Sequence, residues 1–86
     1  MRELEQLLKA LANRRRLQLM RELKSGRSFS VGDLARTLNL SVAATSKHLR
    51  LLARARIVED EKHGLIVNYT LSPQLPHLAR QVVKNL

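Results

Sequence analysis

A mainly α-helical domain with one small β-hairpin is the fold class that the sequence predicts, in the order α-α-α-α-β-β-α. Apolar residues recur at helical spacing in four segments before residue 55 and in one segment after residue 72. Between them, residues 58–71 form two runs with β-branched residues on either side of a glycine, which is typical of a hairpin. The length of 86 residues corresponds to one domain, which we place at residues 1–86.

The first two helices are predicted from their apolar stripes and from one capping residue. Four leucines follow the i, i+3, i+4, i+7 spacing of an amphipathic helix, namely Leu4, Leu7, Leu8 and Leu11. Asn13 is a favourable N-cap residue, so we expect a second helix to begin there and to run to about Lys24. Gly26 follows and ends it.

Two further helices joined by a tight turn are predicted in the middle of the chain. Ser30 begins the third helix, and Asp33 three residues later completes a short capping box. Ser41 caps a fourth helix that runs to about Arg54, and Asn39-Leu40 forms the turn. Two helices joined by three or four residues have the spacing of a helix-turn-helix unit.

A hairpin and a last helix complete the predicted order. Strands at residues 58–62 and 65–71 flank His63-Gly64, where glycine accepts the positive φ of a tight turn. The last helix opens at Ser72-Pro73 or starts near Pro76, because a proline inside a helix removes one hydrogen bond. A helix-turn-helix unit followed at once by a hairpin is a winged helix-turn-helix arrangement.

The charge of the chain indicates a polyanionic partner. Sixteen Lys and Arg residues against seven Asp and Glu residues give a net charge of +9. Between Leu34 and Val58 there are five basic residues and no acidic one. A solubilising surface charge is the plain alternative. Single-strand binders usually stack bases on aromatic side chains, and the only aromatic residues are Phe29 and Tyr69, so a duplex is favoured.

The fourth helix is the predicted reader of double-stranded DNA. One face suits the core, and the opposite face is small near its start and basic further on. The plain alternative is an amphipathic helix with a solvated basic face. DNA contacts are predicted at the start and on the outer face of this helix and at the hairpin tip, namely at Ser41, Val42, Ala43, Ser46, Lys47, Arg50, Lys62 and His63.

Several other classes of function find little support in the sequence. The chain has no cysteine, which excludes disulfides and thiolate metal sites. No paired carboxylates, glycine-rich phosphate loop or serine-histidine-acid set indicates an enzyme. The first residues lack the apolar run of a signal peptide, and no stretch of 18 apolar residues occurs, so we expect neither a secretory signal nor a membrane span. We expect a cytoplasmic protein without a membrane partner, a cofactor, a metal or an obligatory small molecule.

Three stretches resemble the arsenic-repressor type (ArsR/SmtB-like) of winged helix-turn-helix regulators. Residues 8–17 are similar to the start of that family's second helix, residues 40–52 to its recognition helix, and residues 57–71 to its wing. The resemblance implies a homodimer, paired through its first and last helices, that places two recognition helices in successive major grooves of an inverted repeat. It also implies that binding at an operator represses transcription.

The apolar stripes at the two ends of the chain fit the implied dimer. A domain of this size has a marginal core of its own, which favours help from a second subunit. Packing of both stripes inside a monomer is the alternative. The predicted interface contains Leu4, Leu7, Leu8, Leu75, Leu78, Val82 and Leu86.

The chain departs from the family pattern where relatives bind inducers. Ser30 and Gly32 stand where metal-sensing members have two cysteines, and neither offers a soft sulfur ligand. His77 on the last helix lacks a second His or carboxylate one turn away, so the resemblance gives no metal site there. The first wing strand contains Glu59, Asp60 and Glu61, which would repel phosphate if they faced it. Val42 and Ala44 replace polar residues near the start of the recognition helix.

Two other functions remain open from the sequence. A winged helix can serve as a protein-docking module, such as an antirepressor or an assembly subunit, because fold alone does not fix function. A metal-sensing repressor could use His48, His63 or His77 across a dimer. His48 lies on the inner helix face, where a core or hydrogen-bonded histidine is more common than a ligand.

Overall fold

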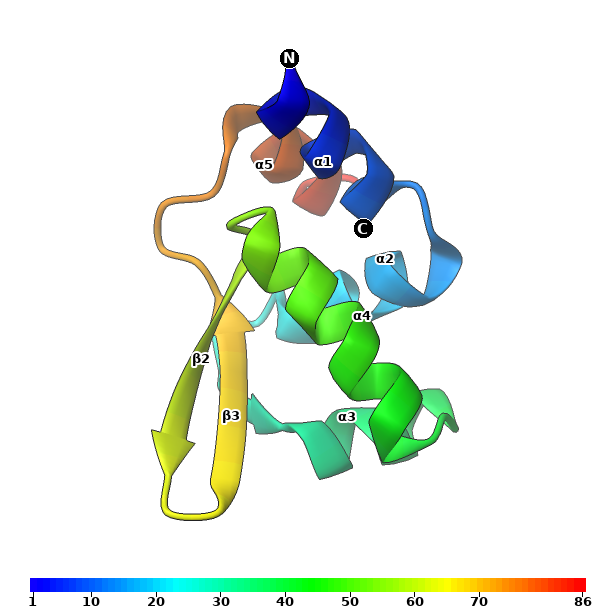
Figure 1. Ribbon diagram of the computed structural model, residues 1–86, viewed down its shortest axis with the longest axis vertical. Coiled ribbons are helices and arrows are strands. Elements are labelled where there is room, and N and C mark those ends of the chain that lie inside the picture. The colour runs from blue at the N-terminus through cyan, green and yellow to red at the C-terminus, as the bar shows by residue number, and fades with distance from the viewer.

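A computed structural model describes all 86 residues of the chain, and it contains five helices and three strands (Figure 1). The predicted order is confirmed, with one short strand added before the third helix. The elements are α1 (Arg2–Leu11), α2 (Arg14–Leu23), β1 (Phe29–Ser30), α3 (Val31–Leu38), α4 (Val42–Arg54), β2 (Val58–His63), β3 (Ile66–Leu71) and α5 (His77–Val83).

Three side chains begin three of the helices, as the sequence predicts. Asn13, Ser30 and Ser41 each accept a hydrogen bond from the backbone N–H three residues later, at 3.0–3.1 Å. Each bond satisfies one N–H group that the first turn of a helix leaves without a partner. The starts of α2, α3 and α4 are therefore set by local sequence.

The turn between α3 and α4 is a Schellman motif centred on Asn39. The N–H of Leu40 donates to the carbonyl of Ala35 at 2.9 Å, and that of Asn39 donates to the carbonyl of Arg36 at 3.2 Å. Asn39 has a φ of 55°, a left-handed conformation that Asn tolerates better than most residues. Ser41 then caps α4 directly, so this short turn fixes the direction of α4 relative to α3.

The hairpin of β2 and β3, hereafter the wing, belongs to an antiparallel sheet of order β1-β3-β2. Its register runs from Val58 opposite Leu71 to His63 opposite Ile66. The tight turn therefore consists of Gly64-Leu65, one residue later than predicted, and the positive φ of 65° is at Gly64. The pairing extends β2 through His63, which the sequence had placed in the turn.

The last helix begins after Pro76, which decides between the two predicted starts. Residues Ser72–Pro76 form no helix, and α5 extends over His77–Val83. The start at Pro73 is wrong because Pro76 would then lie in the helix interior without an N–H to donate.

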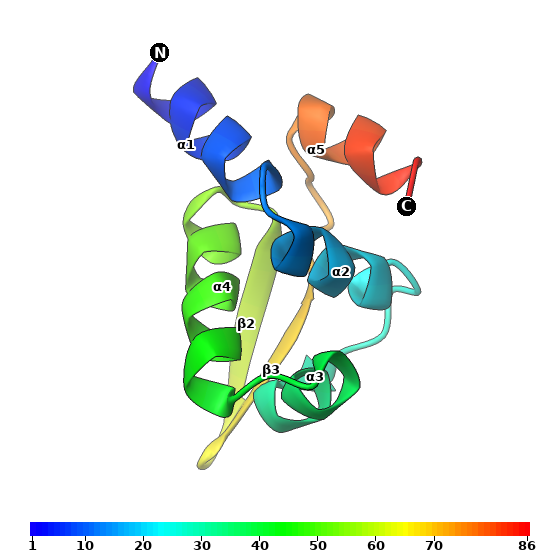
Figure 2. The ribbon, with the colours of Figure 1, turned by 90° about the vertical axis from the view of Figure 1, so that its right-hand side faces the viewer.

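One hydrophobic core joins all five helices and the wing. Its fully buried members include Leu19, Met20 and Leu23 from α2, and Leu49 and Leu52 from α4. In both ribbon views, α1 and α5 lie at one end of the molecule, and the wing tip, α3 and the start of α4 lie at the other (Figures 1 and 2). The two ends of the molecule are therefore built from different elements.

Candidate nucleic-acid interface

The recognition helix α4 has the two faces that the sequence predicts. Thr45, Leu49 and Leu52 are fully buried on its inner face. The outer face contains exposed Ala43, Lys47 and Arg50 together with half-buried Ser46, a set that the structure brings onto one side of the helix. Small side chains precede basic ones along this face, so the helix can approach a surface closely by its N-terminal half.

The first turn of α4 offers backbone dipole and apolar surface rather than side-chain donors. The Ser41 hydroxyl accepts the capping bond from the N–H of Ala44 at 3.0 Å, and the Ser41 carbonyl accepts the hydroxyl of Thr45 at 2.9 Å. Val42 is 55% exposed beside them. The positive end of the helix dipole at this turn favours a phosphate, and the Val42 methyl groups suit a thymine methyl.

The basic face of α4 extends further than the sequence interpretation placed it. Lys47, Arg50 and Arg54 surround Leu51 in a recess of about 190 Å³. Arg54 was not among the predicted contacts, although its spacing of four from Arg50 and seven from Lys47 puts it on the same stripe. Since all three lining charges are positive, the recess favours an anion such as a phosphate.

The wing divides its charges between two faces. Successive side chains of a strand point to opposite sides, so Asp60 and Lys62 share the face on which Val58 is buried. Glu59, Glu61 and His63 lie on the outer face, where His63 Nε2 contacts Glu61 Oε1 at 2.7 Å. Lys62 and His63, both predicted to touch DNA, thus lie on different faces, and His63 already has a carboxylate partner.

Tyr69 of β3 is buried on the inner face of the wing. Burial raises the pKa of Tyr69, the negative charge of Asp60 raises it further, and the positive charge of Arg50 opposes the rise. Asp60 is directly opposite Tyr69 in the sheet. The charges of Asp60 on the wing and of Arg50 on α4 therefore act on the Tyr69 hydroxyl in opposite directions.

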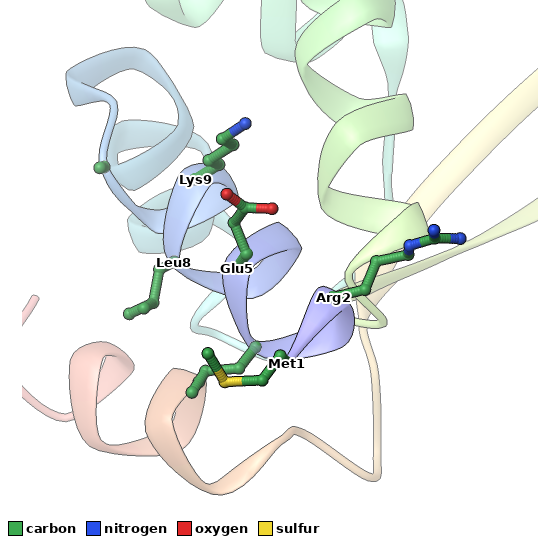
Figure 3. Close-up of a pocket in the computed structure, with 7 residues that line it drawn as sticks. Met1, Arg2, Glu5, Leu8 and Lys9 are labelled. Carbon is green, nitrogen blue, oxygen red and sulfur yellow. The ribbon is translucent and has the colours of Figure 1, made fainter.

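An apolar groove runs along α1 at the other end of the molecule. Its volume is about 730 Å³, and its lining consists of Met1, Arg2, Leu4, Glu5, Leu8, Lys9 and Ala12. Met1 and Leu8 point toward the side of α1 nearer α5, whereas Glu5 and Lys9 point away from it (Figure 3). Met1, Leu4 and Leu8 are 101%, 45% and 50% exposed, which leaves a large apolar surface uncovered.

The predicted dimer residues do not all lie at the surface. Leu78 of α5 is 42% exposed, in keeping with Leu4 and Leu8. The other predicted residues in and around α5 are half-buried against the chain's own core, namely Leu75 before the helix, Val82 within it and Leu86 after it. The placement of Leu7 in the dimer interface is corrected, because this side chain is only 9% exposed and belongs to the core of its own chain. The apolar stripe of α1 therefore supplies both the core, through Leu7, and the exposed surface, through Leu4 and Leu8.

The three histidines lie on three separate elements. His48 belongs to α4, His63 to the end of β2 and His77 to the start of α5. No group of three His, Cys, Asp or Glu side chains in the chain has a geometry that could hold a metal ion. His48 Nδ1 instead lies 3.2 Å from Nη1 of Arg16 on α2.

Comparisons with known proteins agree with this geometry. A family model described as a helix-turn-helix domain matches residues 11–61. The arsenical resistance operon repressor of Escherichia coli is 36% identical over 78 residues, which cover 91% of this chain and 67% of the repressor. The chain belongs to the ArsR/SmtB-like family of winged helix-turn-helix regulators. This ArsR/SmtB-like chain has the fold that its family resemblance implies.

Two further proteins are similar to this chain in sequence or in structure. The transcriptional activator HlyU of Vibrio cholerae is 47% identical over 66 residues, which cover 77% of this chain and 60% of HlyU. The structure of HlyU superimposes with a TM-score of 0.80 at 37% identity, over 96% of this chain and 86% of that chain. A homodimeric winged helix-turn-helix DNA-binding domain, Mb0332 from Mycobacterium bovis, superimposes with a TM-score of 0.81 at 26% identity, over 96% and 74% of the two chains.

The matches leave part of the relatives uncovered. The chain spans 60% of the HlyU sequence and about two thirds of the Escherichia coli repressor. The descriptions of these relatives are those of transcriptional regulators, one activator and one repressor. None of the helices in the structure has the length and apolar character needed to cross a bilayer.

Proposed function

We propose that this ArsR/SmtB-like chain is a homodimeric, sequence-specific regulator of transcription that binds double-stranded DNA in the cytoplasm. The observation that supports it best is the outer face of α4. Lys47 and Arg50 are exposed there, next to small side chains, on the helix whose start lies at the same end of the molecule as the wing tip (Figure 2). Such a helix fits the major groove, which admits an α-helix and presents a distinct pattern for each base pair.

Within this proposal, the residues divide by role. Val42, Ala43 and Ser46 lie against base edges, and Lys47 and Arg50 reach guanine or phosphate. Ser41 supplies the cap and brings the helix N-terminus to a phosphate. Lys62 and His63 approach the backbone from the wing, with Lys62 on the face that α4 shares.

The dimer is proposed to form through α1 and α5. Met1, Leu4 and Leu8 are exposed, as is Leu78 of α5, and α1 and α5 lie at the same end of the molecule (Figure 2). A second copy related by a two-fold axis would cover this surface with the same surface of its own. We leave Leu7 out of the interface. The two α4 helices then face one side of the dimer, as an inverted repeat requires.

Repression is the proposed direct effect. A dimer that occupies a duplex within a promoter excludes polymerase from it. Because the positions of the family's cysteine ligands hold Ser30 and Gly32, we propose regulation without a thiolate metal sensor. A docking module for another protein is the competing function, since Glu59 and Glu61 form an acidic outer face on the wing.

Selection of bound duplexes from a random library at near-physiological salt tests the proposal. The expected result is enrichment of an inverted repeat with half-sites about one helical turn apart. Binding without enrichment would indicate a non-specific architectural role, and it would contradict the sequence-specific regulator. Absence of any binding would refute the DNA proposal and favour the docking module.

A charge reversal on the outer face tests the surface itself. Lys47→Glu places a carboxylate where a phosphate is proposed to lie, so affinity for the selected duplex should fall by roughly 100-fold or more. Lys24→Glu is the matched control, because Lys24 is also exposed but lies at the end of α2. Equal affinities of the two variants, measured by fluorescence anisotropy, would show that the wrong face was chosen.

A further inference from the structure

The guanidinium of Arg16 on α2 forms hydrogen bonds with both α1 and α4, and it thereby connects three helices. Its Nε donates to the carbonyl of Ala10 at 2.8 Å, and its Nη2 donates to the carbonyl of Lys9 at 2.9 Å. These carbonyls belong to the last turn of α1, which has no partner for them within the helix. The third bond, from Nη1, reaches His48 Nδ1 on α4 at 3.2 Å.

The contact with His48 is distinctive among the polar contacts of the molecule. It is the one hydrogen bond between side chains of two different helices or strands, because the other side-chain pairs lie within α2, α3 or β2. A guanidinium only donates hydrogen bonds. His48 Nδ1 must therefore accept, which requires a neutral imidazole with its proton on Nε2.

Arg16 links α1, at one end of the molecule, to α4, which packs against α1 and whose start lies at the other end. α1 presents the apolar groove at which the second copy is proposed to bind, and α4 presents the face that is proposed to read DNA. Arg16 itself lies in the first turn of α2, held by the Asn13 cap that accepts its backbone N–H at 3.1 Å. The side chain is thus placed by a fixed backbone rather than by a mobile loop.

We propose that Arg16 and His48 are positioning residues that fix α4 relative to the dimerisation helix α1, and so set the spacing and angle of the two reading helices in the dimer. The proposal rests on the proposed function. Its energetic basis is the planar fork of the guanidinium, which holds two carbonyls and one ring nitrogen in a single geometry. A lysine at this position has the charge but not the fork.

The same contact makes the spacing of the two reading helices depend on pH. Protonation of His48 removes the acceptor and places a second cation beside the guanidinium. Burial lowers the pKa of His48 below its ordinary value of 6.5, and the positive charges of Arg16 and Arg15 on α2 and of Lys47 on α4 lower it further. α1 contributes the carbonyls of Lys9 and Ala10, and its Gln6 and Lys9 also line a recess beside Arg16. The contact is accordingly intact at neutral pH and is lost in acid.

The test compares a duplex that contains both selected half-sites with one that contains a single half-site. Arg16→Lys should weaken binding to the full site roughly ten-fold, within the range of coupled sites, and should leave half-site binding unchanged. Arg14→Lys is the matched control, since Arg14 is exposed on the same helix, and it should bind both duplexes as the wild type does. Equal weakening on both duplexes, or none on either, overturns the proposal.

A second pair of variants guards against loss of folding. In His48→Asn, Oδ1 lies near the position of Nδ1 and keeps an acceptor for Arg16, whereas His48→Leu has none. Thermal unfolding confirms that each variant is folded. His48→Asn should then keep the wild-type preference for the full site at pH 7.5, and His48→Leu should lose it as Arg16→Lys does. Identical behaviour of the two variants overturns the proposal.

The pH profile gives a readout that a merely structural role would not change. As the pH is lowered stepwise from 7.5 to the point at which the protein begins to unfold, the ratio of full-site to half-site affinity should fall for the wild type and stay constant for His48→Asn. His77→Asn is the matched control, because His77 lies at the start of α5, away from α4 and the wing, and its ratio should fall as in the wild type. A wild-type ratio that does not change with pH, or an equal fall in His48→Asn, contradicts this inference. Failure of the wild type to bind any duplex would instead refute the proposed function.

Discussion

Arg56 occupies a backbone position that is normally a glycine position, and its replacement should stabilise the protein. α4 ends in a Schellman motif in which Ile57 N–H donates to the carbonyl of Leu52 at 2.9 Å and Arg56 N–H to that of Ala53 at 3.0 Å. Arg56 therefore has a φ of 63°. Residues with a Cβ pay about 1–2 kcal/mol in the left-handed region. The extra freedom of glycine in the unfolded chain offsets about 0.5–1 kcal/mol of the gain.

At the midpoints of these two ranges, the net effect of Arg56→Gly is an increase of about 0.75 kcal/mol in the free energy of unfolding. For a domain of this size, that corresponds to a rise of about 3–6 °C in Tm. Thermal and urea denaturation followed by circular dichroism measure it. Arg54→Gly is the matched control, because it also removes an arginine side chain but does so inside the last turn of α4. It should instead destabilise the protein by up to about 1 kcal/mol. A lower Tm for Arg56→Gly than for the wild type would refute the strain argument and assign a stabilising contact to the Arg56 side chain.

Three further outcomes are expected. Arg50→Ala should cost roughly 1–3 kcal/mol of affinity and relax specificity at one base pair if Arg50 reads a base, whereas a shallower salt dependence with uniform weakening would assign it to phosphate. Leu78→Asp should yield monomers in sedimentation. Leu65→Asp, the same change on the fully exposed wing tip, should leave the dimer intact. A dimer that survives Leu78→Asp would place the interface away from α5. Leu49→Ala, at a site with no exposed surface, should lower the free energy of unfolding by about 2–5 kcal/mol in denaturant titrations, and a loss below 1 kcal/mol would mean that the inner face of α4 is not core.

The parts of the fold that local chemistry decides could be predicted from the sequence. Asn13, Ser30 and Ser41 cap helices because a short polar side chain can reach the N–H three residues later, and this depends on nothing distant. The two faces of α4 also follow from helical spacing alone. The same spacing could have identified Arg54, which continues the stripe of Lys47 and Arg50 by one turn.

The features that the sequence did not predict depend on pairing between distant segments. β1 has only two residues, Phe29 and Ser30, too few to show alternation, and it exists because they pair with Tyr69 and Asn68 of β3. The wing turn lies at Gly64-Leu65 because the register from Val58 onward fixes it, not the glycine alone. Such pairings appear only once the chain is folded.

The inward position of Leu7 and the contact between Arg16 and His48 have a common origin. An apolar stripe on α1 indicates that the helix packs against something, but not which part of the stripe meets its own chain. The structure answers this by turning Leu7 toward the core and leaving Leu4 and Leu8 exposed. The rotation of α1 about its axis is defined in part by Arg16, which binds the carbonyls at the end of α1 and a ring on α4. The surface offered to a second copy and the placement of the reading helix are therefore set together, and a change in one should be detectable in the other.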